Sequence, residues 1–118
     1  MLNPLEMAYI GDTVFDLYVR TQLVQDGGRI KDLHRAAVAH VNACAQAKAL
    51  SKVLPVLNED ELSVMRRGRN AHPHHHAPKA ASTEDYAGAT GLEALIGYLY
   101  LVGDFDRLNT LFTYIWEG

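Results

Sequence analysis

The sequence predicts an all-α fold, a bundle of five to seven helices, and two observations support this class. Period-two alternation of apolar and polar residues, which marks strands, is not sustained anywhere in the chain. Capping residues, prolines and glycines instead recur at spacings typical of helix boundaries. The chain has 118 residues, 48% hydrophobic and 21% charged, so we expect residues 1–118 to form one globular domain.

The first helix is marked at both ends. Asn3-Pro4 reads as an N-cap followed by proline at the first helical position. The helix is expected to run to Val24 and to stop at Gly27-Gly28, because glycine is the usual residue just after a helix. Asp32 is expected to cap a second helix that starts at Leu33.

The middle of the chain alternates helices with breaks. A break near Asn42 leads into an alanine-rich helix over residues 43–53, which Pro55 ends. Asn58-Glu59-Asp60-Glu61 has the spacing of a capping box and opens the next helix. Residues 68–81 are expected to form a loop, because they combine glycine, two prolines and four histidines with no apolar side chain larger than alanine.

Two helices are expected after this loop. Ser82 to Asp85 has the spacing of a second capping box, and it opens an apolar helix that continues through Val102. Gly103-Asp104 breaks that helix and caps a last one, which ends near Trp116.

Charge is distributed unevenly along the chain. The net charge is −3, yet residues 29–79 hold nine basic against four acidic residues. A local basic patch, rather than a basic total, is what nucleic-acid binding requires. The single cysteine, Cys44, excludes an intrachain disulfide and a Cys-rich zinc module, which fits a reducing, cytoplasmic location. Apolar stretches are too short for a membrane span, so no membrane partner is expected.

Glu93 is the most unusual residue in this pattern. It lies in a stretch, residues 87–102, that is apolar nearly all round, so the helix should be buried on most faces. A buried carboxylate is destabilising by several kcal/mol unless it is paired or binds a metal. The simpler interpretation is a glutamate paired with a buried arginine.

Asp12 repeats the pattern in the first helix. It follows Gly11 in the middle of an apolar segment, and both residues are weak helix formers. It could instead be a surface aspartate on a polar stripe with Asp16. Two carboxylates within apolar helices suit a hard cation such as Mg²⁺, which uses one or two carboxylates together with waters and substrate phosphate.

A basic segment follows the fourth expected helix. Residues 66–79 carry four fixed positive charges and no acid, and arginine forks match phosphate oxygens. The candidate RNA-binding residues are Arg66, Arg67, Arg69, Asn70 and Lys79. A solvated basic loop without function is the alternative. The neighbouring histidines, His72, His74, His75 and His76, are expected to bind metal adventitiously or not at all.

These motifs resemble a known family. Residues 8–20, AYIGDTVFDLYVR, are similar to the first signature of the ribonuclease III catalytic domain, and residues 93–101, EALIGYLYL, are similar to the second. The segment Arg67-Gly68-Arg69-Asn70-Ala71 and the expected lack of an appended RNA-binding domain resemble the Mini-ribonuclease III subgroup. The resemblance covers essentially the whole chain.

The resemblance implies an endoribonuclease that uses Mg²⁺, with Mn²⁺ as a substitute, to cut double-stranded RNA into 5′-phosphate and 3′-hydroxyl ends. It also implies a homodimer that matures the precursor of large-subunit (23S) ribosomal RNA, with a ribosomal protein as a further candidate partner. Asp12 and Glu93 match the family's catalytic, metal-binding carboxylates. Larger members carry two more acids, where this chain has Ala8 and Thr90. Asp16 and Thr90 are candidates for the outer shell of the site.

A two-fold dimer would present one Asp12/Glu93 pair to each strand of a duplex, and the apolar segment 91–102 is the expected interface. Without a separate binding domain, the basic middle segment must hold the RNA. Double-stranded RNA is recognised through its shape, phosphates and 2′-hydroxyls, which predicts weak sequence preference. Two rival functions remain: a noncatalytic RNA-binding or ribosome-assembly module on the same fold, and a transition-metal hydrolase built on the histidines.

Overall fold

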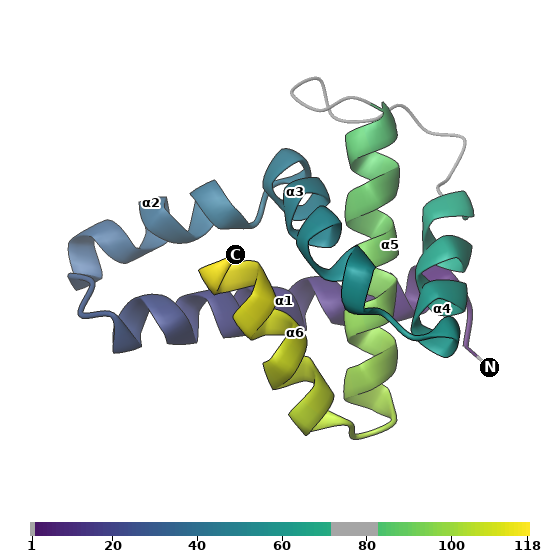
Figure 1. Cartoon of the computed structure of the whole chain (residues 1–118). Helices are drawn as coiled ribbons and strands as arrows, with labels where there is room; N and C mark the ends of the chain where they lie inside the picture. Colours follow the sequence, from purple (N-terminus) through teal and green to yellow (C-terminus); the bar gives the residue numbers. More distant parts are fainter. Residues whose placement is uncertain (1, 72–82) are drawn as a thin grey trace.

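The structure, a computed structural model, describes residues 2–71 and 83–118. These residues form six α-helices and one short 3₁₀ helix, without strands, so the all-helical prediction is confirmed (Figure 1). In chain order the elements are α1 (Pro4–Gln25), α2 (Ile30–His40), α3 (Ala43–Val53), η1 (Leu54–Val56), α4 (Glu59–Asn70), α5 (Thr83–Leu101) and α6 (Phe105–Glu117).

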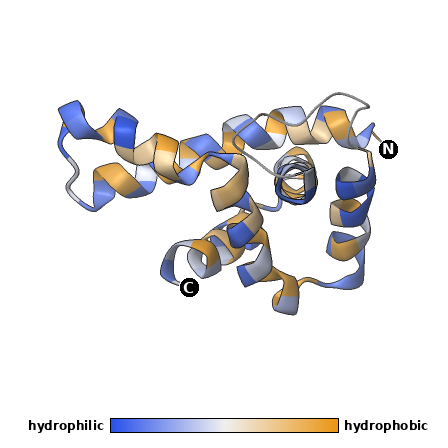
Figure 2. Cartoon of the chain, turned by 90° about the horizontal axis from the view of Figure 1, so that it is seen from above, coloured by the Kyte–Doolittle hydropathy of each residue, from blue (hydrophilic) through white to orange (hydrophobic). Residues whose placement is uncertain are grey.

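Helix α5 is the centre of the fold. Seen along its axis, it has α1, α4 and the pair α3 and α6 around it (Figure 2). Its residues from Ala87 to Leu99 are buried with the exceptions of Glu93 and Tyr98. The prediction that this apolar helix is buried on most faces is therefore confirmed, and its neighbours belong to the same chain.

Most of the predicted helix boundaries agree with the structure. Asn3 caps α1 in a full capping box with Glu6. Asn58 and Glu61 form the same reciprocal pair at the start of α4, with both hydrogen bonds at 2.8–2.9 Å. Gly27 follows α1 with a φ of 87°, in the left-handed region that glycine adopts without strain.

The later boundaries also follow the predictions where they can be compared. The side chain of Asn42 caps α3 by accepting from the N–H of Ala45 at 2.9 Å. Asp104 caps α6 by accepting from the N–H of Arg107 at 3.2 Å. The predicted capping box at Ser82 begins outside the described residues.

Two boundary predictions were wrong. Helix α2 begins at Ile30 rather than at Leu33, because the carbonyl of Arg29 already accepts from the N–H of Asp32 at 2.9 Å and of Leu33 at 3.0 Å. Asp32 therefore lies in the first turn, where its charge suits the helix dipole, instead of capping it. The expected loop from Gly68 onward is helical up to Asn70, since α4 continues that far.

Gly68 lies within α4, and its lack of a side chain allows α4 to pack directly against α5. A Cβ at this position would stand 2.6 Å from the Cβ of Ala94 and 3.1 Å from the Cα of Gly91. Across this contact a Cβ on Gly91 would lie 2.9 Å from the carbonyl oxygen of Met65. Glycine lowers helix propensity by about 1 kcal/mol, and here it allows α4 and α5 to approach closely.

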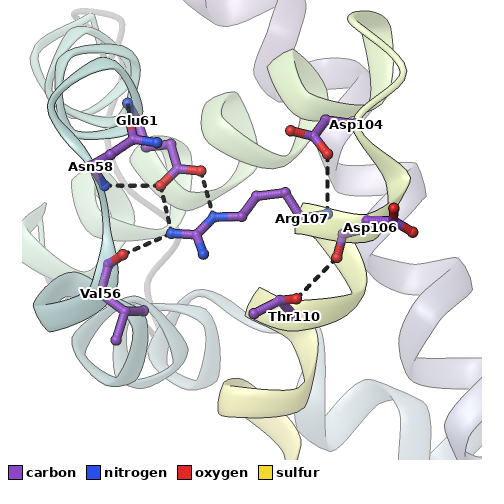
Figure 3. Close-up of polar contacts among 7 residues, drawn as sticks. All are labelled: Val56, Asn58, Glu61, Asp104, Asp106, Arg107 and Thr110. Atoms are coloured by element: carbon purple, nitrogen blue, oxygen red, sulfur yellow. Dashed lines mark hydrogen bonds and ion pairs between the residues drawn. The ribbon is translucent and has the colours of Figure 1, made fainter.

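A buried ion pair fastens α4 to α6. The guanidinium of Arg107 donates to Glu61 at 2.7 and 2.8 Å and to the carbonyl oxygen of Val56 at 2.7 Å (Figure 3). The Glu61 side chain is only 3% exposed. Burial alone would raise the pKa of Glu61, but the hydrogen bonds from Arg107 and from the N–H of Asn58 hold it below its ordinary value. None of the helices in the described part of the chain has the length and apolarity to span a membrane.

Candidate active site

The crossing of α1 and α5 brings Asp12 and Glu93 together. At this crossing the backbones touch: a Cβ on Gly11 would overlap the carbonyl oxygen of Glu93, and a Cβ on Gly97 would overlap that of Met7. Asp12 directly follows Gly11, so its side chain begins beside Glu93, and its carboxyl group is close enough to raise the pKa of Glu93. The two acids singled out in the sequence thus share one location.

Glu93 occupies an unfavourable place for a negative charge. Burial and the neighbouring Asp12 carboxylate raise the pKa of Glu93 from 4.5 to about 9, while a hydrogen bond from Gln46 acts in the opposite direction. Two adjacent carboxylates cannot both be ionised cheaply, so without a cation Glu93 keeps its proton at neutral pH.

The alternative of a buried arginine partner for Glu93 was wrong within the described residues. Two ion pairs in that part of the chain join Asp16 to Arg20 at 2.9 Å and Glu61 to Arg107 at 2.7 Å. Neither involves Glu93. The groups that act on its carboxyl are one acid and one amide.

The two candidates for the outer shell have other partners. Asp16 forms its ion pair with Arg20, one turn further along α1. Thr90 is buried, and its hydroxyl donates to the carbonyl oxygen of Tyr86 at 2.9 Å. Their role around a metal stays a prediction.

The sequence interpretation missed Gln46. Its side chain is 3% exposed, and its amide nitrogen donates to Oε2 of Glu93 at 3.3 Å. The signal was present in the sequence, because residues 46, 49, 50 and 53 follow the helical spacing of a buried face and all four are buried. Only the first of these four is polar.

The basic residues belong to the end of α4, which packs against α5. Arg66, Arg67, Arg69 and Asn70 are exposed in the last turns of α4. The contact of Gly68 with Ala94 places this end of α4 against the α5 residue that follows Glu93. Lys79 and the histidines from His72 to His76 fall outside the described residues.

The oxygen atoms of Asp12 and Glu93 suit a divalent cation that needs only one or two protein ligands. No group of three or more His, Cys, Asp or Glu that could hold a metal occurs among residues 2–71 and 83–118. The neighbouring carboxyl groups of Asp12 and Glu93 offer oxygen ligands, and among the described residues the side chains that act on Glu93 are an acid and an amide. Mg²⁺ is the cation that binds through one or two carboxylates and retains several waters.

Comparison with known proteins defines the class of this fold and site. The family model described as "Ribonuclease III domain" matches residues 5–104. The crystal structure of a protein from Fusobacterium nucleatum superimposes with a TM-score of 0.88 at 28% identity, covering 98% of this chain and 94% of that one. The chain belongs to the ribonuclease III family of endoribonucleases.

Curated relatives narrow the assignment. The chain is 50% identical to Mini-ribonuclease 3 of Symbiobacterium thermophilum over 92% of its own length and 83% of the relative. It is 43% identical to Mini-ribonuclease 3 of a Thermoanaerobacter species, covering 93% and 78% respectively. Within its family, the chain is therefore a member of the Mini-ribonuclease 3 group, as the sequence motifs indicated.

Proposed function

We propose that this protein hydrolyses double-stranded RNA with Mg²⁺, with Mn²⁺ as a substitute, and leaves 5′-phosphate and 3′-hydroxyl ends. The observation that carries the proposal is the pairing of Asp12 with Glu93 at the α1–α5 crossing. The physiological substrate we propose is the precursor of large-subunit ribosomal RNA in the cytoplasm, with a ribosomal protein as a candidate partner. Support for this substrate comes from the family resemblance of the sequence motifs, and membership of the Mini-ribonuclease 3 group is consistent with it.

Asp12 and Glu93 would hold the ion. When bound, Mg²⁺ supplies a water of lowered pKa and positive charge for the phosphate oxygens. Glu93 releases its proton when it takes up this role, because a carboxyl ligand must be deprotonated. Metal binding by this chain is therefore expected to strengthen as the pH rises toward 9, the pKa region of Glu93.

The RNA would lie against the end of α4. Arg66, Arg67 and Arg69 are exposed there, next to the α5 segment that carries Glu93. Asn70 offers an amide for a ribose hydroxyl, and Lys79, which lies outside the described residues, remains a candidate for RNA binding. Contacts of this kind read phosphates and shape, so binding should be strongly salt-dependent and weakly sequence-dependent.

We propose a homodimer whose interface differs from the one the sequence indicated. Residues 91–99 of α5 are covered by α1, α3 and α4 of the same chain, so most of the expected interface is already buried. One group of exposed apolar side chains lies at the start of α1 and the end of α5, and it includes Tyr9, which is 80% exposed. A depression of about 500 Å³ beside Tyr9 is lined by Leu2, Leu5, Ile10 and Leu101, among others.

Replacing Tyr9 with glutamate tests this interface by sedimentation velocity. A charge on the exposed apolar face should turn a dimer into a monomer. A dimer of unchanged stability would place the interface elsewhere.

Cleavage of a perfect RNA duplex, with Mg²⁺ and with chelator, tests the activity. The wild-type protein should cut only with the metal, and Asp12→Asn and Glu93→Gln should each abolish cleavage while still binding the duplex in Ca²⁺. Binding without cutting by the wild type would favour the noncatalytic module. Loss of cutting on replacement of the four histidines, with Asp12→Asn active, would favour the transition-metal hydrolase.

A further inference from the structure

Gln46 stands out as a buried polar group whose position depends on a second helix. Gln46 belongs to α3, where most residues next to it are alanines, and it is only 3% exposed. A buried amide without a hydrogen bond is destabilising by about 1–3 kcal/mol. Here the amide nitrogen donates to Oε2 of Glu93, 47 residues away in the chain, at 3.3 Å.

The backbone that carries Gln46 is held firmly. The side chain of Ala47 packs on α5 at Gly88, where a Cβ would stand 3.5 Å from the Cβ of Ala47. Ala49 and Leu50 are buried in the following turn. At the start of the helix, Asn42 caps the N–H of Ala45. The Cα of Gln46, from which the amide reaches Glu93, is therefore held in place by the packing of α3 on α5.

The chemistry of an amide suits this place. A lysine there would itself pair with Glu93 and compete with a cation, and an acid would add a further carboxyl group beside Asp12. The neutral N–H of Gln46 fixes one carboxylate oxygen while leaving the net charge of the acid pair unchanged. Groups that orient a ligating carboxylate in this way typically change metal affinity 10–100-fold when they are removed.

We propose that Gln46 is a positioning residue, which orients the Glu93 carboxylate from α3 so that it and Asp12 can bind one divalent cation. The proposal rests on the proposed function, because it assumes that Asp12 and Glu93 hold the ion. The proposal adds α3 to the site as a third helix, and it adds Gln46 as a residue that does not itself bind the metal.

The test measures Mn²⁺ affinity directly, by calorimetry or by the electron paramagnetic resonance of free Mn²⁺. Gln46→Met keeps the volume and removes the amide, and it should weaken Mn²⁺ binding by about 10–100-fold. The Mg²⁺ concentration for half-maximal duplex cleavage should rise by the same factor, while RNA affinity in Ca²⁺ changes less than twofold.

A matched control is present in α1. Gln22 also donates its amide to a carboxylate, Oδ1 of Asp26, at 2.9 Å, but on the surface and away from the site. Gln22→Met removes an equivalent hydrogen bond and should leave Mn²⁺ affinity within twofold of the wild type. Equal Mn²⁺ affinity of folded Gln46→Met and wild type would overturn the proposal.

A second variant decides the matter if Gln46→Met does not fold. Gln46→Lys places a cation against Glu93, so it should keep or raise the melting temperature in chelator and lower Mn²⁺ affinity at least tenfold. If Gln46 had a purely structural role, stability and Mn²⁺ affinity would not change in opposite directions. A Mn²⁺ affinity of Gln46→Lys within twofold of the wild type would contradict the proposal. If Glu93→Gln binds Mn²⁺ as well as the wild type does, the metal assignment of the proposed function fails instead, and the proposal about Gln46 fails with it.

Discussion

Replacing Glu93 with glutamine removes the ionisable group at the α1–α5 crossing while preserving its size and a carbonyl acceptor for Gln46. In the wild type without metal, the folded state holds a proton on Glu93 up to a pKa of about 9, whereas the ordinary value is 4.5. Between these values the folded protein binds a proton that the unfolded chain has released. Its stability must therefore decrease as the pH rises.

The magnitude follows from the linkage of proton binding to folding. One proton per molecule corresponds to about 1.4 kcal/mol for each pH unit. Between pH 5 and pH 8, both inside the interval set by the two pKa values, the contribution of Glu93 falls by about 4 kcal/mol. Glu93→Gln lacks this term, so its stability relative to the wild type should increase by that amount over the same range.

Urea unfolding in chelator at pH 5, 6, 7 and 8, followed by circular dichroism, measures the difference. Asp12→Asn provides an internal comparison, because it removes the neighbouring charge and leaves burial, the larger cause of the shift, in place. Its slope should lie between those of the wild type and Glu93→Gln. Parallel stability curves for the wild type and Glu93→Gln would refute the reasoning.

Three further predictions concern the crossings, the buried ion pair and the basic surface. In thermal unfolding, Gly11→Ala should destabilise the fold by about 3 kcal/mol or more, because its Cβ would overlap the α5 backbone. Gly88→Ala should instead stabilise the fold by about 0.5–1 kcal/mol, because a Cβ there meets only ordinary contacts. In urea unfolding, Arg107→Met should lower the free energy of unfolding by about 3–5 kcal/mol, since it leaves Glu61 buried and charged. Adding Glu61→Gln to this variant should recover part of the lost stability. If the effects of the two substitutions simply add, this coupling is contradicted. Arg69→Gln should lower duplex affinity and reduce the slope of log affinity against log salt by about 1 in filter binding, and an unchanged slope would exclude a phosphate contact.

Much of the helical architecture could be predicted from local signals. Caps act through hydrogen bonds over three residues, so Asn3, Asn42 and Asn58 each indicated a helix start that the structure has. The burial of α5 followed from its apolar composition. The predictions at Asp32 and Gly68 were wrong because a local residue preference did not decide the outcome. At Asp32 backbone hydrogen bonds to Arg29 start the helix earlier, and at Gly68 packing against α5 accompanies the continuation of α4.

The site could be predicted only in part. Composition and helix pattern singled out Asp12 and Glu93 separately, but no local rule states that helices at opposite ends of the chain cross there. The two carboxylates in apolar helices suggested a shared cation, and the family resemblance added the expectation that both belong to one catalytic site. Gln46 was missed because a glutamine among alanines carries no charge to mark it, and its importance depends on a long-range contact with α5.

The crossing of α1 over α5 puts peptide group against peptide group, with no side chain between them at Gly11 and Gly97. The two helices therefore approach as closely as their main chains allow at the point from which Asp12 and Glu93 extend. Changes elsewhere in the hydrophobic interior can tilt or swell the bundle without acting as a spacer at this point. A side chain at Gly11 or Gly97 would push the two helices apart and move Asp12 away from Glu93, so any redesign of this enzyme has to keep both glycines.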